Sequence, residues 1–142
     1  MKVEKSCGAV VFTELNGQRK YAIICSSEGF YGFPKGHMEA NETEEQTALR
    51  EIKEETNLDV TLLDNFRTTT QHTFVKNGEE RLKKITYFIG HYDNQKFAKQ
   101  EDEISDISLM DYEEAIGKIQ FDDTKGVLKE AEEYLNKLKK NT

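Results

Sequence analysis

Three glutamates crowded onto one short segment constrain this chain more than any other feature. Glu51, Glu54 and Glu55 lie three and four positions apart in the stretch LREIKEETNL. On a helix, residues at these spacings share a face, so the three carboxylates would project within an arc of roughly 100°. Their mutual repulsion disfavours the helix unless a cation lies between them. Mg²⁺ prefers such oxygen ligands and commonly binds substrate phosphates too, so we expect a metal-dependent enzyme that acts on phosphates.

The residues around these glutamates resemble the signature of a known family. Gly36, Glu42 and Arg50 precede the acidic group at fixed distances, so the segment is similar to the Nudix hydrolase motif G-x5-E-x7-R-E-U-x-E-E-x-G-U, in which U is apolar. One position departs from the motif, because the glycine that ends the family's helix is Asn57 here. Asparagine is the next most tolerant residue in the left-handed conformation, so we expect the helix to end at the same place. The resemblance implies an α/β fold, the Nudix α/β/α sandwich with a central mixed sheet.

Length and composition limit the remaining possibilities. The chain has 142 residues and a net charge of −7, and we expect a single Nudix domain over 1–142. No apolar run is long enough for a membrane span and the N-terminus lacks a signal-peptide pattern, so we expect a cytoplasmic protein. The acidic balance argues against a long nucleic acid as partner, and no obligate protein partner is implied. Cys7 and Cys25 lie in apolar runs and are expected to be buried, reduced thiols.

Apolar periodicity and turn signals predict strands interrupted by helices. Strands are expected at 6–12, 21–25, 58–66, 68–75, 82–92 and 106–110, helices at 42–56, 112–119 and 124–139, and loops at 28–36 and 94–105. We expect Asn41 to be the N-cap of the first helix. The core-facing side of that helix would consist of Ala48, Leu49, Ile52 and Thr56.

The family resemblance also implies a set of metal ligands. These are Gly36 through its carbonyl, Glu51, Glu54, Glu55 and a downstream glutamate that we place at Glu103. Glu101 or Asp102 are alternatives to Glu103 in the same acidic loop. The implied cofactor is Mg²⁺, with Mn²⁺ as an alternative. Bound metal would neutralise charge that develops on the phosphates and lower the pKa of a bound water.

The same resemblance assigns catalytic roles within the motif. Glu51, Glu54 and Arg50 would form the catalytic group, with Glu54 as our first choice of base. Neighbouring carboxylates titrate as a coupled set, so the sequence does not separate base from ligand. Arg50 is expected to orient the carboxylates through a bidentate pair, with Glu42 as a partner. An ordinary surface pair between Arg50 and Glu54 is the alternative.

A second stretch narrows the substrate. The segment GFPKGHME resembles an element of the asymmetrical diadenosine tetraphosphate hydrolases, a Nudix subfamily, and the likeness extends over nearly the whole chain. A dinucleoside polyphosphate needs cations along its phosphates and flat rings for its bases. The candidate substrate-binding residues are Lys35, His37, Lys83 and Lys125 for the phosphates and Tyr87 and Phe121 for the bases. The alternative is that the two aromatic residues belong to the core and that Lys83 and Lys125 are ordinary solvated lysines. His72 and His91 are expected to be ordinary strand residues.

Three functions are compatible with these features. The first is hydrolysis of diadenosine tetraphosphate to ATP and AMP by metal-activated water. The second keeps this mechanism but removes pyrophosphate from 5′-triphosphorylated RNA or from a modified nucleoside triphosphate. The third is a non-catalytic module that binds a nucleotide as a sensor, which the complete set of carboxylates disfavours.

Overall fold

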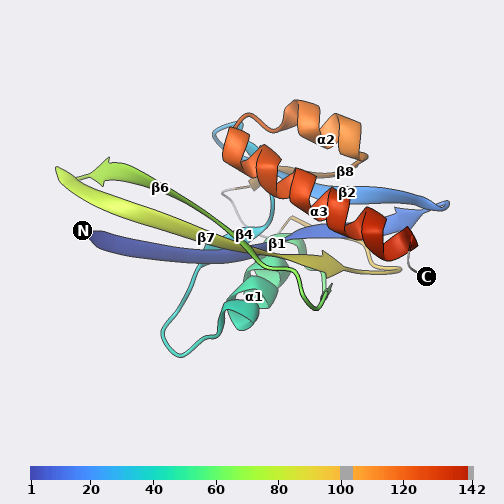
Figure 1. The fold of residues 1–142 in the computed structure, drawn as a ribbon, viewed down its shortest axis with the longest axis horizontal. Coiled ribbons are helices and arrows are strands. Elements are labelled where there is room, and N and C mark those ends of the chain that lie inside the picture. Colours follow the sequence, from blue (N-terminus) through green and yellow to red (C-terminus); the bar gives the residue numbers. More distant parts are fainter. Residues whose placement is uncertain (100–103, 141–142) are drawn as a thin grey trace.

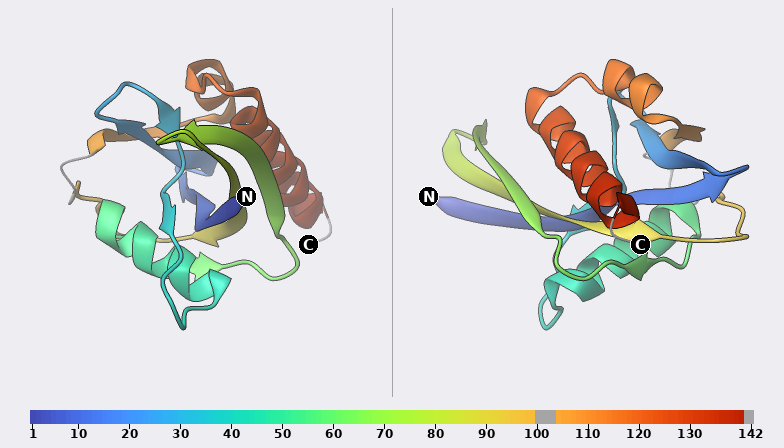
Figure 2. Two further views of the ribbon diagram at one scale, coloured as in Figure 1. Left: turned by 90° about the vertical axis from the view of Figure 1, so that its left-hand side faces the viewer. Right: turned by 45° about the vertical axis from the view of Figure 1, so that its right-hand side comes forward.

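The described chain, residues 1–99 and 104–140 of a computed structural model, forms a mixed β-sheet with helices on both faces (Figures 1 and 2). The elements are β1 (Lys2–Leu15), β2 (Gln18–Ser26), β3 (Tyr31–Gly32), β4 (Lys35–His37), α1 (Glu44–Thr56), β5 (Thr61–Leu62), β6 (Thr68–Lys76), β7 (Glu79–His91), β8 (Ile104–Met110), α2 (Tyr112–Lys118) and α3 (Asp122–Lys140). The strand order is β3-β2-β1-β7-β5, with β4 paired to β1, β6 to β7 and β8 to β2. β1 and β7 pair in parallel and the other pairs are antiparallel. The expected α/β/α sandwich with a mixed sheet is confirmed.

Strict alternation along the central strands creates two separate cores. On β1, Val10 and Phe12 point to the face covered by α2 and α3, whereas Ala9 and Val11 point to the face covered by α1. The parallel register between β1 and β7 places Ile89 opposite Val10, so both strands contribute to the α3 side in matching rows. The central strands are therefore buried on both faces, which explains their nearly continuous apolar sequences.

Helix α1 begins two residues later than the sequence pattern suggests. Thr43 is its N-cap and forms a capping box with Gln46, whereas Asn41 has a positive φ of 73° and lies in the preceding turn. Asn57 ends the helix in the left-handed conformation, with a φ of 64° and its N–H bonded to the Lys53 carbonyl at 2.9 Å. The prediction that the helix ends at Asn57 in the left-handed conformation is thus confirmed. Leu49, expected in the core, is 39% exposed.

Several other boundaries differ from the predicted ones. The expected strand at 58–66 is reduced to Thr61–Leu62, because Leu58 packs into the α1 core outside any strand. The expected loop at 28–36 contains the short strands β3 and β4, and β8 starts at Ile104. Cys7 is fully buried, but Cys25 is only half-buried; both are free thiols. None of the described helices is long and apolar enough to cross a membrane.

The first turn of α1 is tied to the rest of the molecule by Glu44. Its carboxylate accepts two hydrogen bonds from Arg67 at 2.8 Å and one from Lys5 at 3.3 Å. The Arg67 hydrogen bonds are the largest cause that lowers the pKa of Glu44 from 4.5 to about 2. The folded-state pKa is depressed, so the resulting stabilisation is present above pH 4.5 and is lost as the pH falls towards 2.

We therefore predict that Glu44→Gln lowers the free energy of unfolding by ~1–2 kcal/mol at pH 7 and by much less near pH 3. Urea denaturation of both proteins across this pH range measures the difference. Glu45→Gln is the control, because Glu45 is an exposed acid in the same turn. An equal loss of stability for Glu44→Gln at both pH values would contradict the assignment.

Candidate active site

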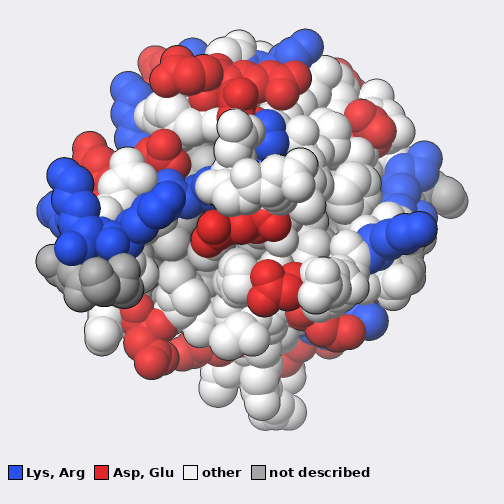
Figure 3. Space-filling view, turned by 90° about the vertical axis from the view of Figure 1, so that its right-hand side faces the viewer, with Lys and Arg blue, Asp and Glu red and all other residues white. Residues whose placement is uncertain are grey.

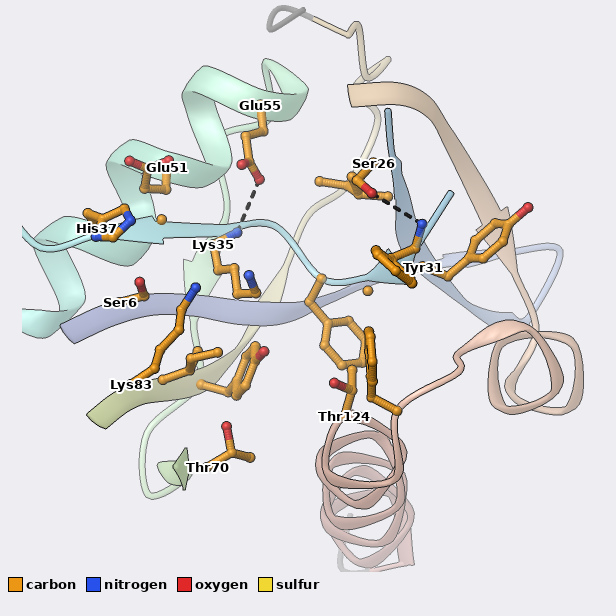
Figure 4. A pocket seen from close by; sticks show the side chains of 18 of the residues that line it. Ser6, Ser26, Tyr31, Lys35, His37, Glu51, Glu55, Thr70, Lys83 and Thr124 are labelled. Carbon is orange, nitrogen blue, oxygen red and sulfur yellow. Dashed lines mark hydrogen bonds between the residues drawn. The ribbon is translucent and has the colours of Figure 1, made fainter. Parts of the chain in front are cut away.

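A cleft with a volume of about 1440 Å³ collects most of the predicted site residues. It exceeds the roughly 300–1,000 Å³ typical of small-molecule pockets. α1 and β4 border one end, β1, β6 and β7 supply the floor, and the segment before β3 and the start of α3 border the other end. Figure 4 shows His37, Glu51 and Glu55 at one end of this cleft and Tyr31 and Thr124 at the other.

Arg50 organises the acidic end of the cleft. Its guanidinium donates to both carboxylate oxygens of Glu42 at 2.6 and 3.0 Å, which confirms the predicted bidentate pair. It also donates to Glu51 at 2.8 Å, to Glu54 at 3.2 Å and to the His37 carbonyl at 2.9 Å. The hydrogen bonds that Arg50 donates to Glu42 are the largest cause that lowers the pKa of the Glu42 carboxyl to about 2. One cation thus fixes three carboxylates and the chain segment that follows β4.

Glu51 and Glu55 are the two motif carboxylates that line the cleft. The Glu51 side chain is 12% exposed, and its burial is the main cause that raises its carboxyl pKa. A Cβ on Gly36 would lie 2.1 Å from the Glu51 carboxyl carbon, so the glycine lets β4 approach this carboxylate. Glu55 accepts a hydrogen bond from the Lys35 backbone N–H at 3.1 Å.

These oxygen donors suit a hard divalent cation. Among the described residues, no three acidic, histidine or cysteine side chains are gathered into a ready-made metal group. Arg50 instead holds Glu51 and Glu54. The fit of a cation rests on Glu51. Desolvation and the nearby Glu54 charge raise the pKa of its carboxyl, so a bound cation would stabilise the charged carboxylate. Gly36, Glu51 and Glu55 border the space such an ion would take.

Two lysines provide the positive charge of the cleft. Lys35 on β4 and Lys83 on β7 both line it, and Figure 4 shows both side chains directed into it. Burial is the largest cause that lowers the pKa of the Lys35 ammonium, and the charge of Lys83 lowers it further. Two ammonium groups close enough to repel each other make a site for a multiply charged anion. His37 lines the same region, as predicted.

Aromatic side chains occupy the end of the cleft opposite the acids. Phe121 and Phe30 are 48% and 45% exposed, and their ring centroids are 5.2 Å apart. Tyr87, predicted as a stacking platform, is 1% exposed and packs edge-on against Phe33, so its ring belongs to the core beneath the cleft. Its burial follows from the α3-facing row of β7, and it leaves little ring face for a base.

The structure does not bring every predicted residue into the cleft. Lys125 is not among the lining residues. At the start of α3 the cleft is lined by Asp123 and Thr124 instead. Glu54 is also absent from the lining, and its side chain is 46% exposed. Glu103, with Glu101 and Asp102, lies outside the described residues.

Several polar and aromatic lining residues escaped sequence reasoning. Four of them are Ser6, Phe30, Thr70 and His72. The register was the missing information, since His72 pairs with Lys83 and both Ser6 and Thr70 pair with Ile85. Alternation within a strand shows which residues share a face, but not which strands adjoin.

We predict that Gly36→Ala displaces the Glu51 carboxylate and weakens binding of a divalent cation by ~10- to 100-fold, with little change in thermal stability. The carboxyl group is the end of a flexible side chain and can move, so the fold survives. Electron paramagnetic resonance titration with Mn²⁺ measures the affinity. Gly32→Ala is the control, because a Cβ there meets no atom within 4 Å. Equal Mn²⁺ affinity in the two variants would remove Gly36 and Glu51 from the metal site.

Comparisons with known proteins agree with this geometry. A family model described as the NUDIX domain matches residues 6–131. The asymmetrical bis(5′-nucleosyl)-tetraphosphatase of Sus scrofa is 28% identical over 145 residues, which cover 92% of this chain and 95% of that protein. The protein called MutT4 from Mycobacterium tuberculosis is 24% identical over 142 residues, and the match spans 57% of its length.

A solved structure extends the comparison to three dimensions. The crystal structure of a Caenorhabditis elegans Ap4A hydrolase binary complex superposes with a TM-score of 0.82 at 23% identity, covering 94% of this chain and 98% of that one. At this identity the likeness shows a shared fold. Because the family model covers most of the sequence, the chain belongs to the NUDIX family of hydrolases and is a pyrophosphohydrolase.

Proposed function

We propose that this protein hydrolyses dinucleoside polyphosphates in the presence of Mg²⁺ or Mn²⁺, with diadenosine tetraphosphate, cleaved to ATP and AMP, as its substrate. The observation that carries the proposal is a single cleft that combines three chemistries. Carboxylates lie at one end, two lysines along the wall and exposed aromatic rings at the other end. The similarity to the pig tetraphosphatase over most of both chains supports the same substrate class.

Each part of the cleft matches one part of such a substrate. Lys35 and Lys83 offset the charge of a polyphosphate, and Phe30 and Phe121 offer ring faces to a base. The cleft is lined both by the acidic residues and by the aromatic pair, and its volume of about 1440 Å³ exceeds that of ordinary small-molecule pockets. This size supports a dinucleotide over a mononucleotide as the substrate.

The acidic residues would perform the chemistry. Glu51, Glu54 and Glu55, with the Gly36 carbonyl, would hold the cation, which when bound supplies charge neutralisation at the phosphates and lowers the pKa of water. Arg50 keeps Glu51 and Glu54 in place by hydrogen bonds. The attacking water gives its proton to a carboxylate of this group. Burial beside the cleft favours Glu51 for that role over the more exposed Glu54.

RNA with a 5′-triphosphate is the competing substrate, because the lysines would suit any polyphosphate. A longer nucleic acid needs a basic track beyond the cleft. Figure 3 shows the side of the molecule that lies at the right in Figure 1, where basic side chains gather at two opposite edges and acidic side chains lie between them. The net charge of −7 also argues against a long nucleic acid as the substrate.

We predict that the purified protein with Mg²⁺ converts diadenosine tetraphosphate to equal amounts of ATP and AMP. A panel that also contains nucleoside triphosphates and 5′-triphosphorylated RNA, resolved by chromatography, measures the products. Glu51→Gln should lower kcat at least about a hundredfold. Release of pyrophosphate from RNA as the faster reaction would favour the competing substrate. Turnover of no compound in the panel would favour a nucleotide-binding sensor.

We predict that Lys83→Ala raises the KM for diadenosine tetraphosphate about tenfold and the KM for ATP, if it is turned over, much less. The longer chain has more phosphates to engage the removed ammonium. Lys84→Ala is the matched control, because Lys84 is the next residue on β7 and points to the opposite face of the sheet. Equal effects of the two substitutions would exclude Lys83 from the substrate path.

A further inference from the structure

We propose that Ser6 on β1 binds the substrate by donating a hydrogen bond from its hydroxyl to a phosphoryl oxygen, between the acidic end of the cleft and Lys83. This assignment rests on the proposed function, since it needs a polyphosphate in the cleft. It adds a neutral, directional donor to the two lysines.

The first support is that Ser6 is the exception among the buried serine and threonine residues. Ser6 is 2% exposed and lines the cleft. Its hydroxyl forms no hydrogen bond within the described chain. The four buried threonine side chains are all bonded: Thr13 to the Tyr92 carbonyl at 2.7 Å, Thr47 to Glu42 at 2.8 Å, Thr56 to the Ile52 carbonyl at 2.6 Å and Thr86 to Thr69 at 3.2 Å. Among the described residues, Nε of Arg81 is the one buried side-chain polar atom without a partner, so the Ser6 hydroxyl is open to the cleft and can donate to a ligand there.

The second support is the place of Ser6 in the sheet. β1 lies between β4 and β7, and Ser6 pairs with His37 on β4 and with Ile85 on β7. Lys83 lies two residues before Ile85 and so points to the same face. Figure 4 shows Ser6 between His37 and Lys83. A phosphate chain that extends from Glu51 and Gly36 to Lys83 must therefore pass over the Ser6 hydroxyl.

The third support concerns the charge of the ligand. Lys35 and Lys83 line the same part of the cleft, and each carries a positive charge that repels a further cation. An oxygen of an anion can accept from the hydroxyl and attract both ammonium groups at once. Thr70 continues this row, because it pairs with Ile85 from the other side on β6. The chemistry thus selects a phosphoryl oxygen.

The test is Ser6→Ala, which removes the hydroxyl and leaves the carbon skeleton. We expect a KM for diadenosine tetraphosphate about tenfold higher, with kcat changed less than about twofold, since the contact is formed in the ground state and the transition state alike. Thermal stability should change little, because the Ser6 hydroxyl forms no hydrogen bond within the described chain. Calorimetric binding of a non-hydrolysable methylene analogue should weaken by the same factor. Binding of inorganic tripolyphosphate should weaken as well, which identifies the phosphates as the contacted group.

Thr13→Val is the matched control at the far end of β1. It removes a bonded hydroxyl, so it should lower thermal stability while KM and the binding constants stay unchanged. Wild-type-like binding of both probes by Ser6→Ala would overturn the proposal, as would a loss of stability with unchanged binding. If the wild-type protein binds tripolyphosphate but not the dinucleotide analogue, the proposed substrate is refuted. The role of Ser6 is then tested by comparing tripolyphosphate binding of the wild-type protein and Ser6→Ala. Failure to bind either probe would refute both.

Discussion

The guanidinium of Arg50 is the interaction on which the site depends. It bonds Glu42, Glu51 and Glu54 at once and reaches the His37 carbonyl, so it links α1 to the segment after β4. Carboxylates at this spacing would repel one another on a bare helix. A lysine would not replace it, because a single ammonium lacks the planar set of donors that serves several acceptors together.

The sheet then sets the distances between the acidic end and the rest of the cleft. Parallel pairing of β1 with β7 fixes Ser6 opposite Ile85, and β4 is held against the other side of β1. That contact is close: a Cβ on Gly8 would lie 2.1 Å from the Pro34 carbonyl oxygen. A side chain there would push β4 away from β1 and with it Lys35 and Gly36. The glycine is thus as much a part of the site as the charged residues.

Local periodicity in the sequence was enough to predict the motif helix, whereas its Asn57 end, the Arg50 pair with Glu42 and the mixed sheet were implied by the family resemblance. The N-cap was not decided locally, because Asn41 with Glu44 and Thr43 with Gln46 both fit the capping pattern, and Thr43 alone forms it. Residue type misled at Tyr87, which is buried by the row of β7 that it occupies, and no local signal marked Phe30, which is exposed beside Phe121. Ser6 was read as part of a core strand, since a single serine among apolar residues carries no periodic signal. These outcomes depend on which strands adjoin, and that is a tertiary property.

The cleft concentrates residues whose placement opposes folding. Lys35 is a partly buried cation close to the charge of Lys83, the Ser6 hydroxyl forms no hydrogen bond within the described chain, and Phe30 is a large exposed ring. Desolvated charge and exposed apolar surface both cost free energy. One ligand with negative charge, hydrogen-bond acceptors and a flat base would contact all three groups favourably. Residues placed against the local preferences of folding often mark a functional site, and the charge, hydroxyl and ring gathered in this cleft all favour the same kind of ligand.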